Sequence, residues 1–195
     1  LLTIPGLRHP SVTDFAISAV ESRFDAMLIM DIEERDQFNT VITSSVQKPH
    51  VLNTVNDLKN RALDTSFAAA YFPDLTVTDP NTNALVPTPP SVAVLGAYAL
   101  NDRIGHPWFA PAGLDRGQIQ RAIGADVYLR TEELDDIYDV DINPIYVPAG
   151  RTEETYIFGQ KTLLQDPSAL DRVNVRRLLI SLRRQVKKVA EQLLF

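Results

Sequence analysis

Apolar residues recur along the chain with two alternating spacings. Residues 11–24 open with the polar capping run Ser11 to Asp14 and then place apolar side chains every three to four positions, which predicts an amphipathic helix. Residues 25–31 are apolar throughout with Asp at both ends, which predicts a short buried strand. Helix then strand repeats over residues 51–63 and 67–77, so the pattern indicates an α/β protein.

The middle of the chain alternates loops rich in Pro with short apolar segments. Residues 79–90 hold four of the 13 prolines and predict a loop, and residues 105–117 predict a second loop that carries the only Trp. Between them, residues 91–100 predict a buried helix. The spacing further predicts a helix over 131–138 and strands over 127–129, 144–147 and 155–159.

The last predicted helix starts at Pro167 and continues to the end of the chain. Its apolar residues fall in a stripe roughly 100° wide at 3.6 residues per turn, and its basic residues fall in a separate sector. We therefore expect one face to pack against the body and the other to be cationic. The apolar positions are Val175, Leu178, Leu179, Leu182, Val186, Val189 and Leu193.

Charge is distributed unevenly along the chain. The net charge is −6, but residues 171–195 carry seven basic and two acidic residues and so reach +5, which leaves −11 for residues 1–170. The densest acidic stretch is 126–141. A basic end on an acidic body suits head-to-tail association or an acidic partner. Two solvated faces are the plain alternative.

Composition excludes several classes of protein. The chain has 195 residues, which suffices for a core, and no Cys, so it has no disulfide, thiolate metal site or cysteine nucleophile. The longest apolar runs are far shorter than the roughly 20 residues that cross a bilayer, and the first residues lack the pattern of a signal peptide. No repeat or linker is visible, so we expect a single domain over residues 1–195.

Candidate chemistry is sparse. His9, His50 and His106 each stand beside a proline, which is typical of loops rather than metal ligands, and no glycine-rich phosphate loop or nucleophile elbow is present. Residues 139–143 resemble the start of an EF-hand loop, but Pro144 and Gly150 occupy positions that need Gly and Glu. We expect no cofactor and no metal.

The acidic stretch leaves one enzymatic alternative open. Glu132, Glu133, Asp135 and Asp136 could supply paired carboxylates to a small α/β hydrolase-like enzyme, which predicts a cleft with raised carboxylate pKa values. An exposed, solvated helix face is the simpler interpretation. Nucleic-acid binding is not expected, because the chain has a pI near 5.0 and its basic helix has no aromatic residue before Phe195.

From residue 67 onward the chain resembles the contractile tail sheath proteins of bacteriophages and the related sheaths of R-type bacteriocins and type VI secretion systems. Each motif is weak alone, but all occur in the order of the family with compatible spacing. They are residues 71–75 (YFPDL), 86–91 (VPTPPS), 94–102 (VLGAYALND), 105–113 (GHPWFAPAG), 142–145 (INPI), 158–163 (FGQKTL) and 171–179 (DRVNVRRLL).

The resemblance implies a structural, non-enzymatic role. A sheath subunit polymerises helically around an inner tail tube and shortens to drive the tube through the host envelope, as part of a virion assembled in the host cytoplasm. It implies an α/β core with a mixed β-sheet flanked by helices, and scaffold roles for residues that match the family motifs. Those residues are Asn143, Pro144, Gly159, Gln160, Thr162, Asn174, Arg176 and Arg177.

The resemblance also implies partners. Other sheath subunits join through extended terminal arms that add strands to a neighbouring sheet, and an acidic tail tube protein faces a basic surface on the core. The candidate basic surface here is Arg176, Arg177, Arg183, Arg184, Lys187 and Lys188. Because family members continue beyond both ends of this sequence, we expect a truncated core without the arms, monomeric and not inserted in a membrane.

Overall fold

A computed structural model describes residues 1–44, 46–120, 122–148 and 154–193. Its helices are α1 (Pro10–Arg23), α2 (Val51–Asn60), α3 (Pro90–Ile104), α4 (Thr131–Asp139) and α5 (Val173–Leu193), with a short 3-10 helix at Ala169–Asp171. Its strands are β1 (Leu28–Asp31), β2 (Ala68–Phe72), β3 (Leu75–Thr78), β4 (Leu85–Thr88), β5 (Gln118–Ile119), β6 (Ala122–Ala125), β7 (Ile142–Tyr146) and β8 (Thr155–Ile157). The predicted α/β class is confirmed.

A five-stranded mixed sheet forms the centre of the fold, in the order β1-β2-β7-β8-β5. β1, β2 and β7 run parallel, whereas β8 is antiparallel to both β7 and β5. β1 and β2 are buried at every position, which explains their uninterrupted apolar sequence. The mixed sheet flanked by helices is the architecture that the family resemblance implied.

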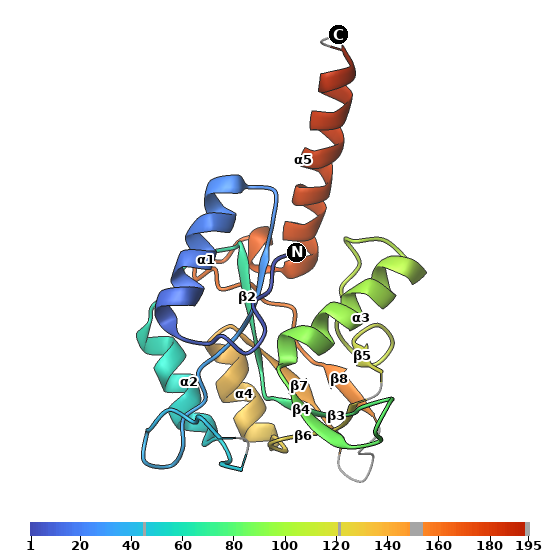
Figure 1. The fold of residues 1–195 in the computed structure, drawn as a ribbon. Helices are drawn as coiled ribbons and strands as arrows, with labels where there is room; N and C mark the ends of the chain where they lie inside the picture. Colours follow the sequence, from blue (N-terminus) through green and yellow to red (C-terminus); the bar gives the residue numbers. More distant parts are fainter. Residues whose placement is uncertain (45, 121, 149–153, 194–195) are drawn as a thin grey trace.

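Helices cover both faces of this sheet (Figure 1). Ala68, Ala70 and Phe72 of β2 face a core shared with α1, α2 and α4, while Ala69 and Tyr71 face a second core shared with α3 and the start of α5. This alternation follows from the two-residue period of a strand. The small Ala residues of β2 leave room for helices on either side.

Two histidines stand at the starts of helices. The His9 Nδ1 accepts a hydrogen bond from the Ser11 N–H at the start of α1, and the His50 Nδ1 accepts one from the Asn53 N–H at the start of α2. Each therefore satisfies a backbone donor that the first helical turn leaves free. The prediction that both histidines lie in loops beside a proline is correct, because each one precedes the first residue of its helix.

The proline-rich stretch is only partly a loop. β4 pairs antiparallel with β3 and places Pro87 opposite Thr76, in a second sheet of order β4-β3-β6. A proline is tolerated there because β4 is an edge strand, where one side of the backbone needs no partner. The prediction of a continuous loop over 79–90 is wrong for this reason.

Three other boundaries differ from the sequence prediction. The segment predicted as one strand over 67–77 divides into β2 and β3 at Pro73, which follows a cis peptide bond. The strand predicted over 127–129 lies earlier, as β6, because Ala122 and Gly124 pair with β3. The last helix starts at Val173 and not at Pro167, since the 3-10 turn intervenes.

Candidate assembly surfaces

Part of the predicted scaffold motif, Pro144 and Gly159, lies around Asn143 on β7. Its amide nitrogen donates to the carbonyl oxygens of Ala70 at 3.1 Å and Lys161 at 2.8 Å, and its amide oxygen accepts from the Lys161 N–H at 2.6 Å. Asn143 itself is fully buried. One side chain therefore ties β2, β7 and the segment after β8 together, and its bond to Ala70 is buried.

Gly159 makes that close approach possible. A Cβ atom at this position would lie 2.8 Å from the Asn143 amide oxygen and 3.3 Å from the Cδ of Pro144. Pro144 accepts from the Phe158 N–H at 2.9 Å, which places β8 against β7. Glycine is required here because a side chain would separate the two strands at the point where Asn143 bridges them.

The segment 160–163 then carries the start of α5. The Gln160 carbonyl accepts from the Val173 N–H at 2.9 Å, and Thr162 donates through its N–H to Asp171 and through its hydroxyl to Leu170. Leu163 donates to Ala68 of β2. α5 is thus anchored to the central sheet through backbone bonds at its first turn. Asn174 is half-buried beside them, and its amide oxygen has no hydrogen-bond partner among the described residues.

Arg176 and Arg177 belong to this anchor and not to a surface. Arg176 donates to the Ser66 hydroxyl and lies 3.9 Å from the centre of the Phe67 ring, and its burial lowers its pKa. Arg177 pairs with Asp102 at 2.5 Å and lies 4.8 Å from the Tyr98 ring. Their inclusion in the candidate basic surface was therefore wrong, because both guanidinium groups are used to attach α5 to the body.

The remaining basic residues of α5 are exposed. Arg183 lies 5.2 Å from the Phe24 ring, and Arg184 donates to the Asp25 carbonyl at 2.8 Å. Lys187 and Lys188 lie beyond the last contact with the body, where the helix stands away from it (Figure 1). These four side chains are the exposed basic residues of α5.

The orientation of α5 is the reverse of the prediction. The face that carries the anchoring arginines contacts the body. Most of the apolar stripe is instead exposed to solvent, including Leu182, Val186 and Leu193. The prediction assumed that an apolar stripe always marks the packed face. Here the anchoring arginines substitute for apolar contacts, since their stems and planar heads cover aromatic rings.

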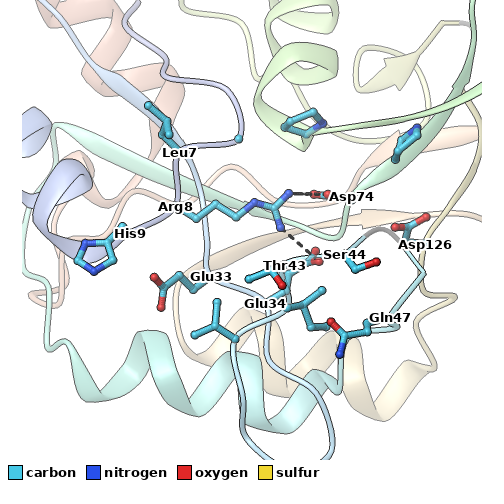
Figure 2. Close-up of a pocket in the computed structure, with 15 residues that line it drawn as sticks. Leu7, Arg8, His9, Glu33, Glu34, Thr43, Ser44, Gln47, Asp74 and Asp126 are labelled. Atoms are coloured by element: carbon cyan, nitrogen blue, oxygen red, sulfur yellow. Dashed lines mark hydrogen bonds and ion pairs between the residues drawn. The ribbon is translucent and has the colours of Figure 1, made fainter.

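A second cluster of charged groups was not predicted from the sequence. A cavity of about 540 Å³ lies beside these groups. Figure 2 shows Arg8 pointing between Glu34 and Asp74 in it. The guanidinium lies 3.2 Å from the Glu34 carboxylate and 2.5 Å from the Asp74 carboxylate. Glu33 and Asp126 line the same cavity. Arg8 therefore holds the segment before α1 onto the carboxyl ends of β1 and β2.

Burial dominates the electrostatics of this cavity. Glu34 is 5% exposed. Its desolvation and the neighbouring Asp74 charge raise its pKa to about 7, although the positive charge of Arg8 acts to lower it. Burial likewise raises the pKa of Asp74. The sequence does contain one signal for this cluster of charged groups. Charged residues follow two buried strands, and the carboxyl ends of parallel strands meet at one edge of a sheet.

The carboxylates proposed for the hydrolase alternative lie elsewhere and behave differently. Glu133 caps α4 by accepting from the Arg130 N–H at 2.8 Å, and its pairing with the Arg130 side chain lowers its pKa. Glu132, Asp135 and Asp136 are exposed to solvent. This is a helix cap with a solvated face, and the lowered pKa of Glu133 is the opposite of the shift that the alternative required.

Two further features bear on function. Among the described residues, no three His, Asp or Glu side chains gather closely enough to hold a metal ion, while Gly150 of the EF-hand-like pattern falls outside those residues. Within the same residues, no helix has both the length and the apolarity to cross a membrane.

Comparisons with known proteins give a consistent result. No family model matches the chain. The chain is 39% identical over 113 residues to the tail sheath protein of Vibrio phage KVP40 and 33% identical over 107 residues to that of Enterobacteria phage T4. These matches cover 58% and 55% of this chain but only 16% of either relative. The chain therefore corresponds to a small part of those proteins.

The fold gives the same relationship. The helical sheath of the anti-feeding prophage in its contracted state superposes with a TM-score of 0.67 at 21% identity, over 100% of this chain and 48% of that one. At this identity the match concerns the fold alone. Sequence and fold together make the chain a relative of the contractile tail sheath proteins, and this relationship favours a structural over a hydrolytic protein.

Proposed function

We propose that this chain, related by sequence and fold to the contractile tail sheath proteins, is part of a structural subunit of a contractile phage tail sheath. Copies of the subunit would polymerise helically around an inner tail tube and contract to drive the tube through the host envelope. The observation that carries the proposal is the 39% identity to a phage tail sheath protein over 113 residues. The protein would be a component of the virion tail, assembled in the host cytoplasm.

A second candidate is the sheath of another contractile injection system, such as an R-type bacteriocin or a type VI secretion system. The likeness of the whole described fold to the anti-feeding prophage sheath favours this candidate. Both candidates assign the chain the same mechanical task. They differ in the particle that carries it.

The charge distribution supports a role for α5 in contact with an acidic tail tube protein. Arg183, Arg184, Lys187 and Lys188 are exposed on α5, whose outer part stands away from the body (Figure 1), and residues 1–170 carry a net charge of −11. Opposite charges of this kind orient partners during association and lose strength as salt screens them. The tube-facing surface we propose therefore consists of these four residues and excludes Arg176 and Arg177.

Charge reversal in the assembling subunit tests this role. Lys187→Glu with Lys188→Glu should prevent sheath from forming around tubes, as seen by electron microscopy, while the melting temperature stays unchanged. Lys59→Glu with Arg103→Glu is the matched control, because it changes the net charge equally at exposed positions on other helices. Normal sheath formation by the first pair would remove α5 from the tube contact.

A further inference from the structure

A small cavity lies between α5 and the body. Its volume is about 310 Å³, and the polar side chains in its wall are Asp102, Arg177, Ser181 and Arg184. Arg184 is exposed and Ser181 is half-buried, so the cavity is open to solvent along α5. We refer to it as the α5 base cavity.

Positive charge is in excess in this cavity. Arg177 pairs at 2.5 Å with Asp102, the one carboxylate that the described residues place in the wall. Arg184 donates to the backbone carbonyl of Asp25 at 2.8 Å and has no ion-pair partner among the described residues. The carboxylate of Asp25 is itself paired with Arg23 at 2.9 Å. Two guanidinium groups in the wall therefore share a single carboxylate.

Arg177 also has a hydrogen-bond donor that is not used. This residue is 7% exposed, and its Nη1 is buried without a hydrogen-bond partner among the described residues. An unpaired buried donor on a charged group is costly. A guanidinium group has five N–H donors in a fixed plane and can bind a further carboxylate beside the one that it already holds. An anion beside Arg177 is therefore favoured both by charge and by hydrogen bonding.

The cavity continues into the exposed basic part of α5. Arg177, Ser181, Arg184 and Lys188 follow one another by steps of four, three and four residues, which places them within about 60° of one another around the helix axis. The outer half of α5 stands away from the body (Figure 1). Lys188 therefore lies on the same side of α5 as the cavity, farther out along the helix. A partner that approaches this side meets the outer basic residues and the cavity together.

The size and lining of the cavity limit what can enter it. About 310 Å³ is at the lower end of pockets that hold a small molecule, so the space suits a single side chain. Met27, Pro107 and Ile180 make part of the wall apolar, opposite the demand of the two guanidinium groups for an anion. A Glu or Asp side chain satisfies both, because its methylene groups contact apolar atoms and its carboxylate accepts hydrogen bonds from arginine.

We infer that the α5 base cavity receives one acidic side chain of the tail tube protein, whose carboxylate binds between Arg177 and Arg184. This inference rests on the proposed contact of α5 with an acidic tube protein and adds a defined pocket to it. Charge at a distance speeds and orients association, whereas a carboxylate held between guanidinium groups fixes the position of the partner. The cavity therefore sets the register of each subunit on the tube.

Binding of a fluorescein-labelled hexaglutamate peptide to the 195-residue chain, followed by fluorescence anisotropy at about 50 mM salt, tests the cavity. Ser181→Asp adds a carboxylate to the wall, where it competes with the peptide for Arg177 and Arg184. We expect this variant to raise the dissociation constant at least about fivefold. Its melting temperature should not fall, because the new carboxylate pairs with groups that lack a partner.

Gln185→Glu is the matched control for the added charge. It introduces one negative charge a single turn farther along the exposed part of α5, outside the cavity. We expect it to raise the dissociation constant by less than about twofold, since exposed charges are screened.

Ala26→Met tests the space in the cavity without a change of charge. Ala26 is a half-buried part of the wall on the side of the body, so the longer side chain narrows the cavity. We expect the dissociation constant of the peptide to rise at least about threefold while the melting temperature shows that the fold is retained. Peptide binding equal to that of the original chain would show that the carboxylate does not enter the cavity.

The outcomes separate this inference from the proposed function. Equal effects of Ser181→Asp and Gln185→Glu, together with weaker binding by the double variant Lys187→Glu and Lys188→Glu, would overturn the cavity and keep the basic surface of α5. Binding that is lost with Ser181→Asp but unchanged in the double lysine variant would support the cavity and contradict the role of the outer helix. If the original chain does not bind the peptide, while sheath formation still depends on the two lysines, the inference alone is overturned.

Discussion

The side-chain amide of Asn143 forms two hydrogen bonds with the backbone of Lys161, one accepted from its N–H at 2.6 Å and one donated to its carbonyl at 2.8 Å. A third bond reaches Ala70 on the neighbouring strand. The pair joins the central sheet to the segment that carries α5. This pair is therefore one of the attachments between α5 and the sheet, beside the Leu163 N–H to Ala68 bond and the Arg176 and Arg177 contacts.

Asn143→Ala should destabilise the domain by about 2–4 kcal/mol. The substitution removes one buried and two partly buried bonds and leaves the Lys161 N–H and two carbonyls without their partners, which costs more than the bonds themselves. Chemical denaturation followed by circular dichroism measures the change. Asn60→Ala, at the exposed end of α2, is the control and should change the free energy of unfolding by less than about 0.5 kcal/mol. Equal effects of the two substitutions would contradict the role of Asn143.

Two glycine substitutions should act in opposite directions. Gly159→Ala places a methyl group 2.8 Å from the Asn143 amide oxygen, so we expect a loss of about 1–3 kcal/mol. Gly96→Ala falls within α3, where nothing lies within 4 Å of the new atom, and alanine should stabilise the helix by about 0.5–1 kcal/mol. Thermal unfolding of the two variants distinguishes them. A Gly159→Ala variant as stable as the original chain would show that β7 and β8 need no close approach there.

Arg177 and Lys188 test the division of α5 into an anchored and a free part. Arg177→Met leaves the partly exposed Asp102 without its partner and should cost about 1–3 kcal/mol. Lys188→Met changes an exposed residue beyond the body and should leave the free energy of unfolding within about 0.5 kcal/mol. Urea titrations of both variants provide the measurement. A larger loss with Lys188→Met would mean that the outer half of α5 packs against the body.

Glu34 should make stability depend on pH in an identifiable way. Its pKa is about 7 in the folded protein and about 4.5 without its burial, so the folded state binds more protons between these values. The contribution of this group to stability therefore falls as the pH rises from about 4.5 to 7, by as much as about 3 kcal/mol. Glu34→Gln cannot ionise and should remove this decline.

The informative quantity is the difference in unfolding free energy between Glu34→Gln and the original chain. We expect that difference to rise in favour of the variant between pH 4.5 and 7 and to stay constant above this range. Measuring the difference cancels the carboxylates whose folded pKa values are lowered, such as Asp36 and Glu133. A difference independent of pH would show that Glu34 is already ionised in the acid range.

Local pattern predicted most of the elements. The helices α1, α2 and α4 and the strands β1, β7 and β8 follow from apolar spacing and from residues that cap or end an element. β4 was not predicted, because a proline such as Pro87 argues against a central strand. The proline is tolerated here because β4 lies at the edge of its sheet. Whether a strand lies at an edge depends on the sheet order, which local sequence does not contain.

The sites depended on contacts between distant residues. Arg8, Glu34, Asp74 and Asp126 are spread over more than half of the chain and meet only after β1, β2 and β6 are in place. The orientation of α5 was predicted wrongly because its arginines contact Ser66, Phe67 and Asp102, which lie far away in the sequence. An amphipathic pattern shows that two faces exist, but tertiary contacts decide which one is buried.

Helical reconstruction by electron cryomicroscopy of the contractile particles that contain this protein tests the central claim most directly. The account predicts that the fold of α1 to α5 repeats along the helical wall around an inner tube and that each copy keeps its central sheet intact. Particles whose wall lacks this fold, or in which the chain occurs as a single copy outside the helical array, would contradict its assignment as a sheath subunit.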